Sequence, residues 1–298
     1  MSDADRVLAH IERYCDAAPR SAAHAEDFGP LTLFVRDGAG YQYYARPTLG
    51  HRGPLTATHV RVVLARQQEL GIAQSFEWVA ETTPSLEAVA IAEGLNVHRH
   101  PLMVLGGSAA TTSAATTSAG AMSAAITSAG ALSAGAMSAG AVDVVVRVLG
   151  PDDPVLASAT AVPHLAFNEP GTHLGCAGLP ELAEQAARVI EDGSAGRTAE
   201  RIRRGLSVVA AAIEDGVALC SGQHHPVGDT TEIAGVGTLP SARRRGLARV
   251  VTAALLADAR AGGISTVFLS ASDPAVARIY ARLGFQPIGT ALIAEPAE

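Results

Sequence analysis

The sequence predicts two α/β (α+β) units in tandem. Strand-like and helix-like segments follow one another in the order ββαβαβ, and this order occurs once in each half of the chain. A stretch built mainly from Ala, Ser, Thr and Gly separates the halves, and 298 residues is a typical length for two domains. We therefore expect a first domain at 1–105, a flexible linker at 106–142 and a second domain at 143–298.

The composition is that of a globular protein with an acidic balance. Hydrophobic residues make up 48% of the chain and charged residues 17%, which is enough apolar surface for a sizeable core. The formal net charge of −7 argues against general nucleic-acid binding, because such binding depends on neutralising phosphates. It weakly favours cationic substrates such as amines.

Three further features exclude other classes of protein. Cys15, Cys176 and Cys220 are odd in number and far apart, so no metal site or disulfide framework is expected. The acidic N-terminus has no apolar segment, which predicts a cytoplasmic protein without a signal peptide. No charge occurs between Arg99 and Asp143, but the many Ser, Thr and Gly residues there argue against a membrane span.

The elements of the first half are predicted from periodicity and turn chemistry. Val60, Val63 and Leu64 recur at helical spacing after a capping Thr. Asp37-Gly38-Ala39-Gly40 is typical of a hairpin turn, and Gly94 is typical of a helix end. We expect helices at 5–17, 56–70 and 85–93, and strands at 31–36, 41–45, 75–80 and 97–105.

The second half repeats this order after an additional strand and helices. Asp215-Gly216 predicts a turn between two strands, and a loop is expected at 222–230. His224 and His225 would then lie at the end of a strand. We expect strands at 143–149, 206–213, 217–221, 231–238, 266–270 and 285–293, and helices at 155–166, 180–190, 198–204, 247–260 and 274–282.

The two halves are in approximate register at an offset of 190 residues, with Gly94-Leu95 opposite Gly284-Phe285. This favours an internal duplication. The alternative is that two α/β units resemble each other because the element order is common.

One stretch of the second half combines a strand, a turn and the start of a helix. The run at 232–237 is strand-like, and it leads into Thr238-Leu239-Pro240-Ser241-Ala242-Arg243-Arg244-Arg245-Gly246-Leu247-Ala248 and then into an amphipathic run. Such a turn suits an anion, because the first N–H groups of a helix have no internal partner and the helix dipole favours negative charge. The spacing Arg243-x-x-Gly246-x-Ala248 resembles the R/Q-x-x-G-x-G/A pyrophosphate loop of the GNAT family of N-acetyltransferases.

A second motif follows downstream. The run from Asp273 to Phe285 resembles N-x-x-A-x-x-x-Y-x-x-x-G-F of the same family, with Tyr280 and Gly284-Phe285 matching. Asp273 replaces the usual Asn, and Val276-Ala277 replaces the small residue. The resemblance covers 143–295 in element order and 229–290 in motif detail.

The resemblance implies a mixed, mostly antiparallel sheet flanked by helices, and it implies acetyl-CoA as co-substrate without a metal. The pyrophosphate would bind the loop N–H groups, the pantetheine arm would pair with the strand at 232–239, and a strand N–H near 236–238 would polarise the thioester carbonyl. The implied cofactor-binding residues are Val236, Gly237, Thr238, Arg243, Arg244, Arg245, Gly246, Leu247, Ala248 and Asp273.

Two proton transfers would accompany acetyl transfer to an amine. Glu232 lies eleven residues before Arg243, the spacing at which several family members carry a general base, and Tyr280 matches the tyrosine that protonates the leaving thiolate. Both have simpler structural interpretations, as a strand-edge acid and a packing tyrosine. His224 or His225 is an alternative base.

The first half lacks these motifs. At the offset of 190, Arg243 falls on Gly53, and no R-x-x-G-x-G/A pattern occurs near 50–60. We therefore expect a degenerate GNAT-like first domain and a single working cofactor site.

The expected activity is acetyl transfer to the amine of a small molecule or peptide by direct attack in a ternary complex, in a monomer or homodimer with no nucleic-acid or membrane partner. The alternatives are a non-catalytic acyl-CoA-binding or regulatory module and a protein-interaction scaffold.

Overall fold

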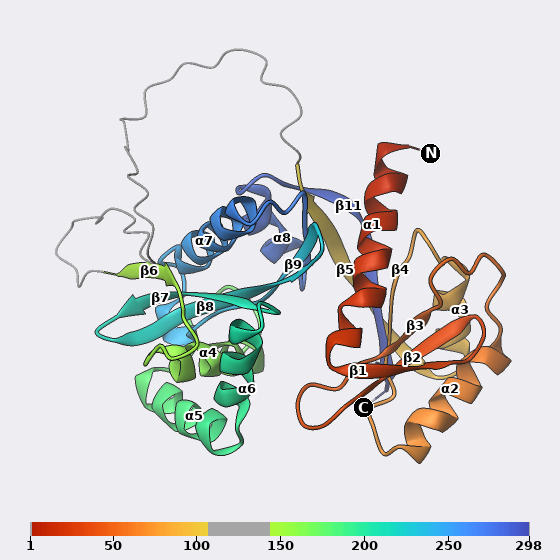
Figure 1. Ribbon diagram of the computed structural model, residues 1–298, viewed down its shortest axis with the longest axis horizontal. Helices are drawn as coiled ribbons and strands as arrows, with labels where there is room; N and C mark the ends of the chain where they lie inside the picture. The colour runs from red at the N-terminus through yellow and green to blue at the C-terminus, as the bar shows by residue number, and fades with distance from the viewer. Residues whose placement is uncertain (1, 107–143, 298) are drawn as a thin grey trace, which may run out of the picture.

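The computed structural model describes residues 2–106 and 144–297 and shows two halves joined side by side (Figure 1). The first half contains helices α1 (Asp3–Ala17), α2 (Ala57–Glu69) and α3 (Ser85–Ala92), and strands β1 (Ala23–Asp27), β2 (Leu31–Arg36), β3 (Ala45–Pro47), β4 (Phe76–Val79) and β5 (Leu95–Leu105). The second half contains helices α4 (Leu156–Asn168), α5 (Leu179–Glu191), α6 (Ser194–Arg203), α7 (Leu247–Ala261) and α8 (Pro274–Ala281), and strands β6 (Val145–Val148), β7 (Val208–Glu214), β8 (Val217–Val227), β9 (Thr230–Thr238), β10 (Thr266–Ser270) and β11 (Phe285–Pro296).

All the strands of the described residues belong to one sheet. Their order is β1-β2-β3-β4-β11-β5-β10-β9-β8-β7-β6, so the last strand of each half is inserted into the other half. β5 pairs with β10, β11 pairs with β4, and the two strands pair with each other in the middle. The mixed α/β class with a mostly antiparallel sheet is as predicted, but the exchange of strands between the halves was not.

The strand pairing has the same pattern on both sides of the central pair. β1–β2 and β2–β3 are antiparallel and β3–β4 is parallel, as β7–β8, β8–β9 and β9–β10 are in the second half. α2 begins at 57 and α7 at 247, β4 begins at 76 and β10 at 266, and β5 begins at 95 and β11 at 285. Each of these pairs is 190 residues apart, which agrees with an internal duplication.

The offset changes immediately before α2. Ala45 pairs with Phe76 in the first half, and Thr230 pairs with Thr266 at the corresponding place in the second half. Phe76 and Thr266 are 190 residues apart, whereas Ala45 and Thr230 are only 185 apart. The first half is therefore five residues shorter between β3 and α2. The missing length corresponds to the part of the second half that contains the end of β9 and the Arg-rich turn, so the motif from Arg243 to Ala248 has no counterpart in the first half.

Three local predictions differ from the structure. β1 was not predicted, and the strand expected at 41–45 is instead Ala45–Pro47, after a longer loop. β8 extends to Val227, so the loop expected at 222–230 is almost entirely strand, because β9 continues to pair with this part of β8. Of the predicted linker at 106–142, all but Gly106 lies outside the described residues.

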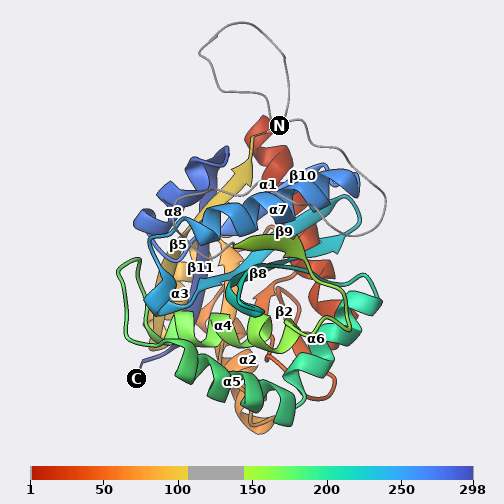
Figure 2. The ribbon, with the colours of Figure 1, turned by 90° about the vertical axis from the view of Figure 1, so that its left-hand side faces the viewer.

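Helices cover both faces of the second-half strands. α4 and α5 lie on one side of β8 and β9, and α7 lies on the other (Figure 2). Ser221 of β8 donates from Oγ to the Ala159 carbonyl of α4, whereas a Cβ on the adjacent Gly222 would meet Leu255 of α7. These contacts fix which face of β8 each residue occupies, because side chains alternate along a strand.

Helix α1 lies between the two halves (Figure 1). A capping box at Ser2 begins it, and its buried Leu8, Ile11 and Tyr14 pack with Phe268 of β10 and with side chains of β4 and β5. The edge of the Tyr14 ring meets the Phe268 ring at 5.0 Å between centroids. Burial of each such side chain contributes about 1.5–3 kcal/mol to the stability of the folded chain. The contacts of α1 therefore stabilise the packing of the first half against the second.

None of the helices in the described ranges combines the length and apolar character needed to cross a membrane.

Candidate functional site

Strands β9 and β10 pair only over a short stretch and then separate. Thr230, Thr231 and Glu232 pair with Thr266, Val267 and Phe268. Beyond this point β9 continues to Thr238, whereas Phe268 to Ser270 of β10 pair with β5. The last six residues of β9 therefore have no ladder partner on the β10 side.

A bulge in β9 lies within this unpaired stretch. Gly235 and Val236 together oppose the single residue Gly222 of β8, and Gly235 has a φ of +60°. An extra residue in one strand bends it and increases its twist. The bend directs β9 away from β10, and glycine permits the left-handed backbone that the bend requires.

The N–H groups after the bulge alternate in direction. The Leu239 N–H donates to the Leu219 carbonyl of β8 at 2.8 Å. Since successive N–H groups of an extended strand point to opposite sides, those of Thr238 and Val236 point toward the side from which β10 has departed. They supply two aligned donors between the separated strands.

The Arg-rich turn follows β9 and leaves a run of backbone N–H groups without acceptors among the described residues. In the described part of the chain, the N–H groups of Arg244, Arg245, Gly246, Leu247 and Ala248 have no hydrogen-bond acceptor. Arg244 and Gly246 have φ values of +64° and +77°. Successive N–H groups in alternating right- and left-handed conformations form an anion nest, and here the nest opens onto the N-terminus of α7.

Two of the three arginine side chains hold this turn in place. Arg243 donates to the carbonyls of Ala166, Glu169 and His173, in and after α4. Arg245 donates through both terminal nitrogens to Glu214 at 2.9 Å. Arg244 is exposed, and no described carboxylate forms an ion pair with it. The turn therefore presents backbone N–H groups and one guanidinium outward.

Glu232 lies at the base of the separation between β9 and β10. It is opposite Phe268 on one side and His225 on the other, so its side chain shares a sheet face with His225 and α1. Burial raises the pKa of Glu232 to about 7, although the side chain keeps some solvent contact. A carboxyl with this pKa is partly ionised at neutral pH and can accept a proton.

Groups of the first half lie around Glu232, and none of these residues was identified from the sequence. The Tyr14 hydroxyl donates to the His225 carbonyl at 2.8 Å. Glu77 of β4 has its pKa raised to about 8 by burial and by the negative charge of Glu232, and Arg46 opposes this shift. More than 150 residues separate Glu77 from Glu232 in the chain, and only the strand exchange brings the two halves together here.

Tyr280 of α8 is buried, with 9% of its surface exposed, and packs edge-on against Phe285 at 6.0 Å. Burial, and to a smaller extent the nearby Cys220 sulfur in its ionised form, raise the pKa of Tyr280 to about 12. Its hydroxyl is therefore protonated at neutral pH and can donate. Cys220 receives a hydrogen bond from Thr238 Oγ1 at 3.3 Å, which places Tyr280 near the end of β9.

Glu232 and Tyr280 approach the separated strands from opposite faces. Cys220 and His225 lie an odd number of residues apart on β8, so their side chains project from different faces of the sheet. Glu232 shares the face of His225, and Tyr280 lies near Cys220. A group held between β9 and β10 would thus have an acceptor of protons on one side and a donor on the other.

The two histidines lie within β8 rather than at a strand end, and they differ in environment. His224 is buried on the α7 side, where Nδ1 is 3.0 Å from Thr231 Oγ1 and Nε2 is 3.0 Å from Asp258 Oδ2. His225 faces α1 and α6, and burial lowers its pKa to about 4. With both nitrogens of His224 engaged and His225 a weak base, Glu232 is the better proton acceptor.

Asp273 caps helix α8. Its Oδ1 accepts from the N–H groups of Ala275 and Val276 at 2.6 and 2.9 Å. This gives the residue a structural function at the start of the helix that carries Tyr280, and a contact with a cofactor stays a prediction. In the described ranges, no three His, Cys, Asp or Glu side chains are arranged to hold a metal ion.

Comparisons with known proteins agree with this geometry. Residues 212–293 match the family model described as FR47-like protein. No curated sequence matches the chain.

Solved structures resemble the chain over almost its whole length. A GCN5-related N-acetyltransferase from Kribbella flavida has 20% identity and a TM-score of 0.61, covering 98% of this chain and 96% of that one. A functionally unknown conserved protein from Staphylococcus epidermidis has 12% identity and a TM-score of 0.51, covering 94% and 96%. A putative GNAT acetyltransferase from Novosphingobium aromaticivorans has 18% identity and a TM-score of 0.47, covering 94% and 93%.

The first two likenesses extend across both halves and the exchanged strands. The chain therefore has the fold of the GCN5-related N-acetyltransferase from Kribbella flavida across both halves, and part of its second half, residues 212–293, is similar to the FR47-like family model.

Proposed function

We propose that the protein is an acetyl-CoA-dependent N-acetyltransferase whose working site lies in the second half. The observation that carries this proposal is the separation of β9 from β10 directly before an anion nest at the start of α7. A long, narrow cofactor with a pyrophosphate at one end and an amide-containing arm at the other fits such a combination, because each part finds unpaired backbone donors.

The backbone would do most of the cofactor binding. The N–H groups from Arg244 to Ala248 would hold the pyrophosphate, with the exposed Arg244 adding positive charge. The pantetheine amides would pair with the unpaired edge of β9. The N–H of Val236 or Thr238 would donate to the thioester carbonyl and stabilise the oxyanion that develops during attack.

Glu232 and Tyr280 would move the two protons. Glu232 would take a proton from the acceptor ammonium, directly or through a water molecule, and the free amine would then attack the acetyl carbon. Tyr280 would donate its proton to the departing CoA thiolate. The supporting features are the partly ionised state of Glu232 at neutral pH, the protonated state of Tyr280, and their positions on opposite faces of the opened sheet.

The decisive experiment separates cofactor binding from turnover. Acetyl-CoA is titrated into the protein in a calorimeter, and thiol release is then measured with a panel of amines. We expect saturable binding and amine-dependent release of CoA. Absence of acetyl-CoA binding would contradict the proposal and favour an interaction scaffold. Binding without turnover of any amine would favour a non-catalytic acyl-CoA-binding or regulatory module.

A further inference from the structure

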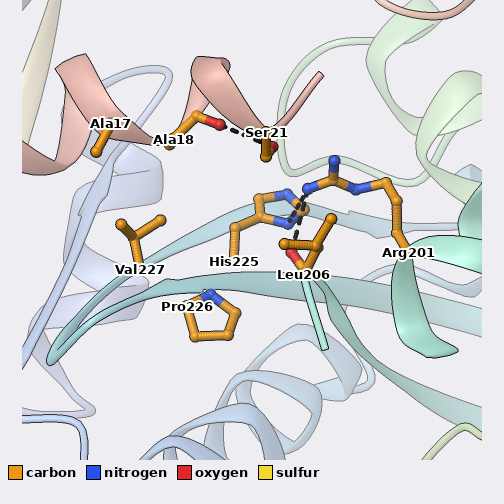
Figure 3. Close-up of a pocket in the computed structure, with 8 residues that line it drawn as sticks. All are labelled: Ala17, Ala18, Ser21, Arg201, Leu206, His225, Pro226 and Val227. Carbon is orange, nitrogen blue, oxygen red and sulfur yellow. Dashed lines mark hydrogen bonds between the residues drawn. The ribbon is translucent and has the colours of Figure 1, made fainter. Parts of the chain in front are cut away.

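A cavity of about 370 Å³ lies between the end of α1 and strand β8 (Figure 3). One of its lining residues, His225, is opposite Glu232 in the β8–β9 ladder. The C-terminal end of α1 and the short turn after it form one wall, and β8 and the end of α6 form the other. Much of the lining is aliphatic, from Ala17, Ala18, Leu206 and Val227. The cavity therefore has contributions from both halves and suits a small molecule with a methylene chain.

An uncompensated cation reaches this cavity. Arg201 of α6 donates from Nη2 to the Leu206 carbonyl at 3.1 Å. Among the described residues, no carboxylate lies within 4.0 Å of its guanidinium, although the chain carries a net charge of −7. A half-buried guanidinium without a counter-ion favours an anionic ligand.

The adjacent histidine adds a second donor. His225 Nδ1 lies 2.6 Å from Ser207 Oγ and 3.5 Å from Arg201 Nη2. In the tautomer in which Nδ1 accepts from these two groups, the proton of the neutral ring is on Nε2. Figure 3 shows this second ring nitrogen turned toward the end of α1. In that tautomer Arg201 and the Nε2–H group both present donors to the cavity.

The cavity is next to the proposed base. Glu232 stands directly opposite His225 in the β8–β9 ladder, and directly opposite residues have Cβ atoms about 5 Å apart on one face. A ligand whose anionic end lies between Arg201 and His225 would place a group a few bonds away beside Glu232. Tyr14, through its bond to the His225 carbonyl, holds α1 over this region.

We propose that this cavity binds the acceptor, and that the acceptor is a small aliphatic primary amine with a carboxylate at its other end. The proposal rests on the acetyltransferase function proposed above. Arg201 and His225 hold the carboxylate, the aliphatic walls contact the methylene chain, and the ammonium lies at Glu232. Glu232 removes one proton from the ammonium, the amine nitrogen forms a bond to the acetyl carbon, the carbon–sulfur bond breaks, and Tyr280 protonates the thiolate. The nitrogen then loses its second proton, which returns to Tyr280 through solvent, and Glu232 releases its proton to solvent. The products are the N-acetyl amino acid and CoA.

The test compares matched amines. Initial rates of thiol release are measured with β-alanine, 4-aminobutyrate and 5-aminovalerate, and with the amides of the same acids, which lack the negative charge. We expect kcat/KM to be about 10- to 100-fold higher for the best acid than for its amide, the range that follows from loss of a hydrogen bond to a charged partner. Arg201→Ala should raise KM for the acid by a similar factor and leave kcat for the acid nearly unchanged. The same variant should leave kcat/KM for the amide unchanged.

Two further variants serve as controls. Arg201→Lys keeps the charge and should restore part of the preference for the acid. Arg203→Ala changes an arginine on the same helix that pairs with Asp152 on the surface. This variant should leave kcat and KM unchanged for both the acids and the amides. Equal kcat/KM for acids and amides, or an unchanged KM for the acid in Arg201→Ala, would overturn the assignment of the acceptor.

Calorimetry distinguishes this failure from failure of the proposed function. If acetyl-CoA binds but none of the three acids binds or reacts, the acceptor assignment is wrong and the cofactor site stands. If the acids bind in an Arg201-dependent way and acetyl-CoA does not bind, the cavity is an amino-acid site and the acetyltransferase proposal is wrong.

Discussion

At the residue scale, the environment of Glu232 decides its chemistry. The side chain is at the meeting point of β9, β8 and α1, and burial brings its pKa to about 7 from the usual value near 4.5. A general base works best when its pKa is close to the working pH, because it is then both ionised and able to hold a proton. The same residue on an exposed strand edge would be a much weaker base.

The first prediction concerns the pH dependence of the rate. In the wild type, kcat/KM should rise with pH and bend near pH 7 as Glu232 loses its proton. Glu232→Gln should lower kcat by about 10²- to 10⁴-fold, the usual contribution of general base catalysis, and should remove this bend. The measurement is a pH–rate profile of both proteins with one amine. A variant that retains the bend would assign the base function to another group.

Tyr280 carries the second prediction. Tyr280→Phe removes only the hydroxyl and keeps the ring packed on Phe285, so folding should be preserved. Loss of the proton donor should reduce kcat by about 10²-fold while the Kd for acetyl-CoA stays nearly constant. Single-turnover rates and calorimetry measure the two quantities separately. A wild-type rate in this variant would reduce Tyr280 to a packing residue.

Glu77 carries the third prediction, which concerns stability rather than rate. Its pKa of about 8 in the folded protein is above the usual 4.5, so the folded state keeps a proton that the unfolded state loses between these values. The contribution of this group to stability is therefore present below pH 4.5 and is lost as pH rises toward 8.

Glu77→Gln should consequently raise Tm relative to wild type at pH 9 and leave the difference small or reversed at pH 4. Thermal unfolding followed at several pH values measures the effect. A Tm difference that does not change with pH would show that the Glu77 carboxyl titrates normally.

At the element scale, the turn between β9 and α7 is the part that the first half lacks. Its N–H groups are left without acceptors, and Arg243 and Arg245 tie it to α4 and to the end of β7. Gly246 is required because the turn needs a positive φ at this position. Steric room is not the reason, since a Cβ there would meet no atom within 4 Å. The side chains of Arg243 and Arg245 thus hold the turn in place, while its backbone N–H groups stay available to a ligand.

The fourth prediction uses two glycines with the same constraint. Gly246 and Gly263 have φ values of +77° and +76°, and a Cβ on either would meet no atom within 4 Å. Alanine at either position should destabilise the protein by about 1–2 kcal/mol through backbone strain. Only Gly246→Ala should also weaken acetyl-CoA binding, because Gly263 lies at the opposite end of α7. Urea unfolding and calorimetry test the pair, and equal affinities in the two variants would remove the turn from the cofactor site.

At the scale of the whole molecule, the exchange of β5 and β11 makes the halves interdependent. The two strands pair with each other over almost their full length, from Leu105 opposite Phe285 to Leu95 opposite Pro296. Each also completes the sheet of the other half. An isolated half would expose the unpaired edges of β4 or β10, which are unfavourable and prone to association.

The fifth prediction follows from this interdependence. A protease site introduced within 107–143 and then cleaved should leave two fragments that co-elute in gel filtration at the mass of the whole chain, with acetyl-CoA binding retained. The strand pairs and the α1 contacts, rather than the covalent connection, hold the halves together. Separation of the fragments at micromolar concentration would contradict this.

The sequence alone predicted the α/β class, the order of most elements, the repetition at an offset of 190 and the motifs around Gly246 and Tyr280. These follow from local rules: helical and strand periodicity, turn chemistry and the need for particular residue types in an anion-binding turn. β1 and the full length of β8 were missed because their residues are stabilised by pairing with neighbouring strands more than by their own pattern.

Only the tertiary structure determined which groups of the first half lie beside the motif residues of the second half. Strand exchange pairs residues that are far apart in the chain, from 164 positions for Val104 and Phe268 to 218 for Phe76 and Ala294, and no local pattern encodes which of two similar edges a strand will join. That pairing brings α1, Glu77 and Tyr14 to Glu232, raises the pKa of Glu232 through burial, and encloses the cavity beside Arg201 and His225. The motif of the proposed cofactor site is local and could be predicted from the sequence, whereas the proposed acceptor site depends on contacts between the halves and became visible only in the folded chain.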